Sequence, residues 1–251
     1  MLKKIALAFG ILCLAAFTII IWAQNIEEVP KEKMDTIMNG WVQRGLYYVF
    51  DNRGIMKAVK ISGDPVGFRQ FQYTTFRMGV NDFVEYTYKL NGKQSVNLLL
   101  VDEVTDSTAI LSSGTPFVRA DSSEGMLGTW KNIKSPTTML LTIEPETIRY
   151  SETVFEIETG SFKTIENRQG KYRREPAGRD IYKQTENGGR YHIMFEDGRT
   201  RTMLPVIYDG LMYLFDLTPT KSEFVKMDPG KVPTYRDYQA VLEKRKAVSR
   251  K

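Results

Sequence analysis

Turn-forming residues recur at short intervals through most of this 251-residue chain. Between about residue 40 and about residue 228, Gly, Asn, Asp and Pro interrupt short apolar segments roughly every 8 to 12 positions. The clearest turns are Asn91-Gly92 and Asp197-Gly198, dipeptides that fit the two-residue turns of β-hairpins. This spacing is typical of antiparallel sandwiches and barrels. It therefore predicts a mainly β protein.

The same pattern predicts individual strands. Expected hairpins pair residues 46–50 with 55–61, 84–90 with 94–101, 139–143 with 147–150, and 191–195 with 200–207. An aromatic strand is expected from Phe68 to Phe76, and further strands at 211–217 and 223–227. Residues 160–166 and 170–174 are predicted as two short strands around a turn at Asn167-Arg168-Gln169.

Each end of the β region carries a helix signal. Pro30 suits the first position of a short helix that Gly40 can end. Thr234 can cap a C-terminal helix whose apolar face holds Tyr235, Tyr238, Val241 and Leu242. We expect this second helix to pack against the last sheet or to close one end of a barrel.

The two halves of the chain are weakly similar to each other. Asn91-Gly92-Lys93, a strand and then Phe117 to Asp121 are similar to Asp197-Gly198-Arg199, a strand and then Phe224 to Asp228. The identical positions are Gly92/Gly198, Leu98/Leu204, Phe117/Phe224, Val118/Val225 and Asp121/Asp228. Any two β-meanders share turn glycines and alternating aliphatic residues, so both duplication and coincidence stay open.

These signals together predict the domain organisation. Residues 1–24 are a signal peptide or N-terminal membrane anchor, 25–121 a first β lobe, and 128–251 a second β lobe with the C-terminal helix. The polar, glycine-bearing segment from Arg119 to Gly128 is the boundary. The predicted fold is an antiparallel meander forming two related barrel or sandwich lobes, with a short N-terminal helix and a C-terminal helix.

The run from Ile5 to Ala23 carries no charge, and Lys3 and Lys4 precede it. It is longer than the apolar region of a typical cleaved signal, about 7 to 15 residues, and shorter than the roughly 20 that span a membrane. Cleavage and retention as an anchor both stay open. Lipidation of Cys13 is disfavoured because Leu12 stands where a lipobox has a small residue. We expect a periplasmic protein, or one anchored in the inner membrane through residues 5–23 and facing the periplasm.

Composition argues against several kinds of chemistry. Cys13 is the only cysteine, so the rest of the chain has neither a disulfide nor a thiol. The formal charge of +5, from 35 basic and 30 acidic residues, describes a mixed surface and predicts no nucleic-acid partner. The basic C-terminal residues fit a solvated helix end, with attraction to anionic lipid or to an acidic partner as the alternative.

No recognised catalytic motif stands out. His192 is the only histidine and is expected to be structural, so neither a metal nor another cofactor is predicted. Glycosidases need only two nearby carboxylates, and the region from Glu144 to Glu158 is rich in them. However, Glu152, Glu156 and Glu158 alternate with apolar residues, as on a solvated strand face. We expect no enzyme, with a carboxylate-pair hydrolase as the remaining possibility.

Gly128-Thr129-Trp130-Lys131 opens the predicted second lobe. This Gly-x-Trp resembles the opening of lipocalin-like (calycin) barrels over residues 128–228, and the predicted helix from Thr234 to Val248 resembles that family's C-terminal helix. The first half has Gly40-Trp41 without the spacer. The family's second and third motifs cannot be placed in the chain. The resemblance implies that Trp130 closes the barrel base, and that the barrel binds a ligand or is reused for protein contact.

The favoured hypothesis is a bacterial envelope protein that binds a small apolar or lipid-like molecule in a β-barrel pocket. Inward-facing aromatic and aliphatic side chains would line such a pocket. The alternative is a periplasmic inhibitor or immunity protein that blocks a secreted hydrolase or toxin. For that alternative, the predicted loop 168–180 supplies the candidate partner contacts Lys171, Arg173, Arg174 and Arg179.

Overall fold

A computed structural model describes residues 26–63, 66–90, 93–134, 137–156, 158–177, 185–218 and 223–249. The predicted signal or anchor, residues 1–24, lies outside these ranges. Within them, no helix combines the length and the apolar character needed to cross a membrane.

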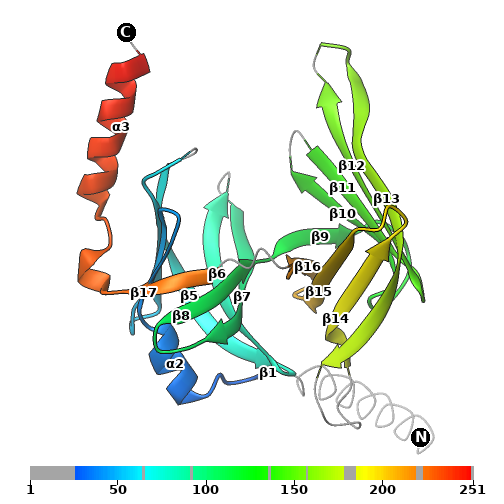
Figure 1. Cartoon of the computed structure of the whole chain (residues 1–251), viewed down its shortest axis with the longest axis horizontal. Coiled ribbons are helices and arrows are strands. Elements are labelled where there is room, and N and C mark those ends of the chain that lie inside the picture. The colour runs from blue at the N-terminus through cyan, green and yellow to red at the C-terminus, as the bar shows by residue number, and fades with distance from the viewer. Residues whose placement is uncertain are drawn as a thin grey trace, which may run out of the picture.

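The first barrel is a closed antiparallel sheet (Figure 1). Its strands are β2 (Gly40–Gln43), β3 (Leu46–Phe50), β4 (Ile55–Lys60), β5 (Gly67–Met78), β6 (Asn81–Leu90), β7 (Lys93–Val104), β8 (Thr108–Ser113) and β17 (Glu223–Met227). The pairing of β5 with β6 closes the ring. The short strand β1 (Ile26–Glu27) pairs with the C-terminal end of β5, at Arg77 and Met78.

The second barrel is also closed and antiparallel, in the order β10-β11-β12-β13-β14-β15-β16-β9. Its strands are β9 (Thr115–Arg119), β10 (Gly128–Lys134), β11 (Thr137–Ile143), β12 (Thr147–Glu156), β13 (Ser161–Ala177), β14 (Thr185–Phe195), β15 (Thr200–Tyr208) and β16 (Leu211–Asp216). The prediction of a mainly β chain with two barrel lobes is therefore confirmed.

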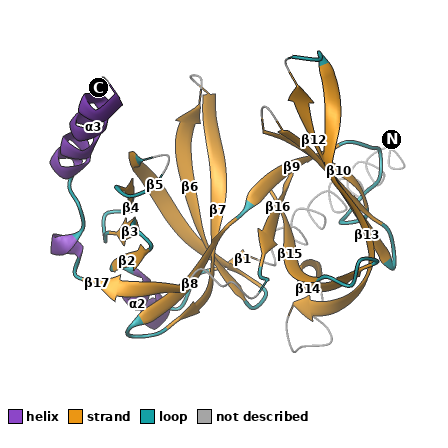
Figure 2. Ribbon diagram, turned by 45° about the horizontal axis from the view of Figure 1, so that its top comes forward, coloured by secondary structure: helices purple, strands orange, loops and turns teal. Residues whose placement is uncertain are grey.

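Each barrel is a seven-strand meander completed by a strand from elsewhere in the chain. β9 follows the first meander but lies between β16 and β10, whereas β17 follows the second meander and lies between β8 and β2. Figure 2 shows β9 passing from one barrel to the other. The sheets therefore divide the chain differently from the predicted lobes, because β9 falls within 25–121 and β17 within 128–251.

The topology supports a duplication. β9 and β17, which carry the matching residues Phe117 and Phe224, occupy the same position in opposite barrels. The first strand of each meander also carries a buried tryptophan, Trp41 or Trp130. In both, the indole nitrogen donates a 3.0 Å hydrogen bond to the carbonyl oxygen four residues earlier. A shared local device at the same topological position is expected of two copies of one unit.

One local prediction is wrong. The two short strands expected at 160–166 and 170–174 are a single strand, β13, which continues to Ala177. The residues predicted as its turn, Asn167 to Gln169, pair instead with Ser151, Tyr150 and Arg149 of β12. A register shift between Glu152 and Thr153 allows the ladder to continue past this point.

Apolar side chains fill both barrels and the space between them. Where the barrels meet, one buried apolar cluster combines side chains of β5, β6 and β7 of the first barrel with side chains of β15 and β16 of the second. Phe83 meets Phe215 across this junction, with ring centroids 5.6 Å apart. Tyr208 stacks on Phe76 and donates a hydrogen bond to Glu85. An ion pair of 2.6 Å joins Arg190 to Asp102 at the same interface.

In the part of the chain that the structure describes, both α-helices lie with the first barrel. Ile37 of α2 (Lys31–Ile37) is buried in the first core. α3 (Tyr235–Ser249) follows the 3-10 turn η2 (Pro229–Lys231), and its Tyr235 and Tyr238 rings contact Phe68 of β5. Thr234 and Asp237 cap α3 reciprocally, as a capping box does. The helix that resembles the calycin C-terminal helix thus packs on the first barrel, because β17 returns the chain there.

The exchanged strand β17 should be essential to the first barrel. Phe224 is 2% exposed and lies 5.3 Å from the ring of Tyr48, so Phe224→Ala should cost about 3 kcal/mol of unfolding free energy. Because the barrels share a core cluster, urea denaturation followed by circular dichroism should show one transition at a lower midpoint. Val225→Ala, at a 54% exposed position of the same strand, is the control. A midpoint equal to that of the control would contradict this role.

Asp82 should anchor α2 to the barrel. Its side chain is fully buried and forms ion pairs with Lys33 at 2.5 Å and Arg77 at 2.6 Å. Burial alone would raise the pKa of Asp82, but hydrogen bonds and charges from Arg77 and Lys33 outweigh burial and hold this pKa below its usual value. The folded state therefore binds fewer protons than the unfolded state in acid. The resulting stability is complete above the unfolded pKa of about 3.9 and is lost as the pH falls through the folded pKa.

Asp82→Asn should therefore cost about 3 to 5 kcal/mol at pH 7, because it leaves two cations without their buried partner. The difference from the wild type should begin to narrow below about pH 4, where Asp82 of the unfolded chain becomes protonated, and should close as the pH falls through the lower folded pKa. Urea denaturation at several pH values measures both effects, with Asp106→Asn at an exposed turn as the control. A pH-independent difference would count against the ion-pair explanation.

Candidate functional site: a pocket between the barrels

A cavity of about 370 Å³ opens where β8 of the first barrel runs into β9 of the second. Its first-barrel wall is mainly apolar and contains Leu46, Tyr48, Leu99, Leu111 and Phe224. Its second-barrel wall contains Phe117, Met139, Tyr150, Met203 and Leu214. The site is therefore built from both barrels.

The exchanged strands supply matching residues to this pocket. Phe117 of β9 belongs to the core of the second barrel and Phe224 of β17 to that of the first, and both line the cavity. The similarity between the two halves of the sequence matches these two phenylalanines but does not indicate their role. Their alternation with exposed neighbours indicates only that they face inward, not which barrel they enter.

The charged part of the lining, Arg201 and Asp216, lies on the second-barrel side. Arg201 of β15 forms a 3.5 Å ion pair with Asp216 of β16. Tyr150 of β12 donates a 3.1 Å hydrogen bond to Glu152. Burial raises the pKa of Tyr150 well above its ordinary value, and Glu152 adds to the effect. The phenol is therefore protonated at neutral pH and acts as a hydrogen-bond donor.

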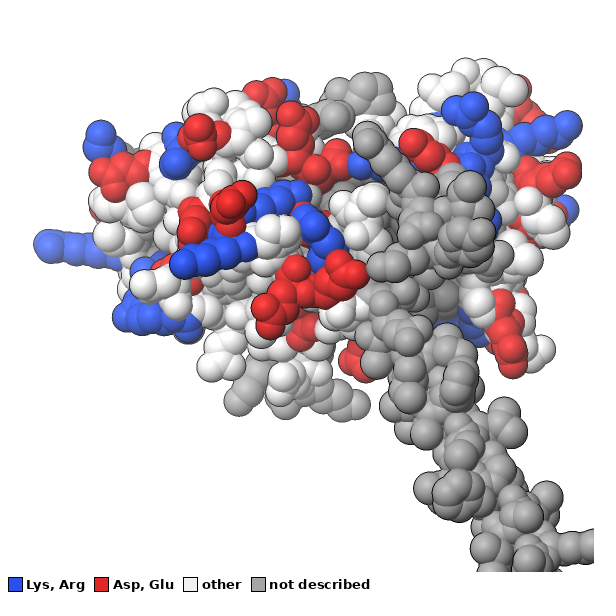
Figure 3. Space-filling view, turned by 90° about the horizontal axis from the view of Figure 1, so that it is seen from below, with Lys and Arg blue, Asp and Glu red and all other residues white. Residues whose placement is uncertain are grey.

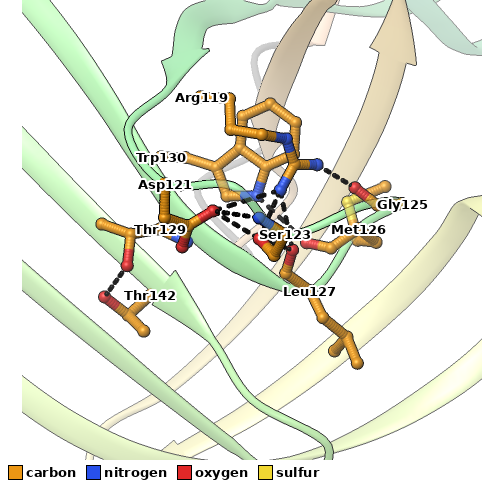
Figure 4. Close-up of polar contacts among 9 residues, drawn as sticks. All are labelled: Arg119, Asp121, Ser123, Gly125, Met126, Leu127, Thr129, Trp130 and Thr142. Carbon is orange, nitrogen blue, oxygen red and sulfur yellow. Dashed lines mark hydrogen bonds and ion pairs between the residues drawn. The ribbon is translucent and has the colours of Figure 1, made fainter.

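Hydrogen bonds and a cation–π contact hold the loop between β9 and β10 against Trp130 (Figure 4). The Arg119 guanidinium lies 4.0 Å from the centre of the Trp130 ring, and it also donates to Ser123 Oγ at 2.6 Å and to the Leu127 carbonyl at 3.0 Å. Met126 of this loop is buried in the second core. The buried Trp130 is compatible with the calycin-like role that the sequence resemblance implies.

The structure does not gather the candidate partner contacts on one surface. Lys171, Arg173 and Arg174 are exposed, but they belong to strand β13 and not to the predicted loop; Arg179 lies outside the described residues. Arg173 lies opposite His192, whereas Arg174 lies opposite the buried Tyr191. Because neighbouring positions of a strand point to opposite faces, Arg173 and Arg174 diverge. Basic and acidic side chains are also interspersed over the face seen in Figure 3.

The acidic residues singled out in the sequence are dispersed. Glu144 accepts a hydrogen bond from Thr147, and Glu156 pairs with Lys163. Glu152, expected on a solvated face, lies on the same side of β12 as the buried Tyr150. Among the described residues, no group of three or more His, Cys, Asp or Glu side chains is placed to hold a metal ion.

His192 bridges two side chains on the second barrel. Its ring nitrogens lie 3.2 Å from Thr202 Oγ1 and 3.1 Å from Glu175 Oε2. The ring therefore links β14 to β15 and β13, which is consistent with the structural role expected for it.

Comparison with known proteins finds no matching family model, no matching curated protein and no matching solved structure. Two closed antiparallel barrels are compatible with a calycin-like fold.

Proposed function

We propose that this protein is an exported, non-enzymatic envelope protein that holds a small apolar or lipid-like ligand between its two barrels. The observation that supports this function most directly is the 370 Å³ cavity, whose apolar lining comes from both barrels. Small-molecule sites have volumes of about 300 to 1,000 Å³ and combine mostly apolar walls with a few polar groups. The cavity is at the lower end of that range and suits a compact or singly chained molecule.

Export is supported by the sequence. The uncharged run from Ile5 to Ala23 follows Lys3 and Lys4, as in a signal or anchor. The absence of cysteine after Cys13 suits an oxidising compartment, because no thiol of the exported part could be oxidised. A ligand carrier that works in the bacterial periplasm is consistent with both features.

Filling the cavity should abolish binding. Met139→Trp places a larger side chain on the second-barrel wall, so the protein should lose at least about tenfold in affinity for a neutral apolar fluorescent probe such as N-phenyl-1-naphthylamine. The matched control is Met194→Trp, a change of the same size at a 62% exposed position on β14. Fluorescence titration measures both affinities, and thermal denaturation checks that both variants fold.

Equal losses in the two variants, or no binding by the wild type, would contradict a ligand pocket at this place. The second outcome would favour the alternative of a periplasmic inhibitor or immunity protein. That alternative stays a prediction, and the exposed Lys171 and Arg173 are where its test would begin.

A further inference from the structure

A polar row crosses the interior of the second barrel beside the pocket. Asn132, Met139, Glu152 and Glu166 lie directly opposite one another on β10, β11, β12 and β13. Residues opposite each other in an antiparallel sheet point to the same face. Met139 lines the pocket, so the whole row faces the barrel interior.

Asn132 has a buried acceptor without a partner in the described ranges. Its side chain is buried, with 5% exposure, and its amide nitrogen donates a hydrogen bond to the Pro116 carbonyl. Within the described residues, its Oδ1 atom is buried and accepts no hydrogen bond. Native structures hydrogen-bond nearly all buried acceptors, so this oxygen calls for a donor. Thr115 and Phe117, which flank Pro116 in the sequence, line the pocket. Met139, which lies opposite Asn132 on β11, lines it too.

The carboxylates in and around the row have different partners. Arg168 pairs with Glu166 at 2.6 Å, and Arg201 pairs with Asp216 at 3.5 Å, so both guanidinium groups already have carboxylate partners. Glu152 instead accepts a hydrogen bond from a neutral group, the Tyr150 hydroxyl. Next to the pocket-lining Met139 and Tyr150, the row therefore holds a carboxylate, Glu152, and a neutral acceptor, Asn132 Oδ1.

The matching ligand group is a cation with several N–H donors. A carboxylate head group would lie near Glu152 and would have to compete with Asp216 for Arg201, which is unfavourable in a partly buried site. Asn132 and Glu152 lie on either side of Met139, and a primary ammonium has three donors with which to bond acceptors on both sides.

We propose that the second barrel binds the ammonium head group of an amphipathic amine, whose apolar body lies against Leu99, Leu111 and Phe224 of the first barrel. This inference rests on the proposed function and adds the chemical class of the ligand. Each barrel then has its own part in recognition.

The test compares three probes with the same chain on the full-length wild-type protein: dodecylamine, dodecanol and dodecanoate. Competition with the fluorescent probe gives the three affinities. A charge-assisted hydrogen bond contributes about 1 to 1.5 kcal/mol more than a neutral one, which corresponds to about tenfold in affinity. Dodecylamine should therefore bind at least about tenfold more tightly than dodecanol, and dodecanoate should bind most weakly.

Glu152→Gln should remove the preference for the amine while leaving the affinity for dodecanol unchanged. The control is Glu156→Gln, which changes the same residue type on the same strand at a position paired with Lys163. Glu156→Gln should keep the wild-type order of affinities.

The outcomes separate the two proposals. If none of the three probes binds, the proposed function fails. If dodecanol and dodecanoate bind at least as well as dodecylamine, the pocket stands and the inference about its head-group site is overturned. The wild-type comparison needs no substitution, so it decides the question even if Glu152→Gln fails to fold.

Discussion

Closure of each sheet by a strand from the other half of the chain is the constraint on which the rest of the structure depends. Seven-strand meanders end in two open edges, β2 and β8 in the first barrel and β10 and β16 in the second, and an open edge exposes unpaired backbone donors and acceptors. β17 and β9 cover these edges. Because β9 and β17 must both cross, the barrels lie side by side, and the apolar cluster around Phe83 and Phe215 fills the space between them.

The position of the pocket follows from this exchange. The chain crosses at Gly114, where a Cβ atom would come within 2.8 Å of the Phe215 ring, so the crossing strand lies closer to β16 than a side chain would allow. Ser113 and Thr115 on either side of it line the cavity, as does Phe224 on the returning strand. The exchange therefore both fastens the barrels together and creates the surface that both share.

Local features were predictable from the sequence, whereas strand partners were not. The dipeptides Asn91-Gly92, which lies outside the described residues, and Asp197-Gly198 identified the hairpins of β6 with β7 and of β14 with β15 because turn chemistry is local. Phe117 and Phe224 alternate with exposed residues in the same way whichever barrel they enter, so alternation could not reveal the exchange. The apparent turn at Asn167 failed because pairing along β12 overrides local propensity. Glu152 was expected on a solvated face because it is charged, but it shares its side of β12 with the buried Tyr150 and accepts that hydroxyl's hydrogen bond.

The two barrels share one topology but differ in what fills them. Aromatic rings occupy much of the first interior, where Phe50 and Tyr73 meet edge to face at 5.5 Å. The second barrel also has an aromatic and aliphatic core, but beside it lies the row from Asn132 to Glu166, with a buried acceptor and carboxylates. Since the fold is the same, only the side chains can account for this difference. The two barrels thus share one architecture, and the second adds polar groups to an apolar core, which is the combination that the proposed amphipathic ligand would use.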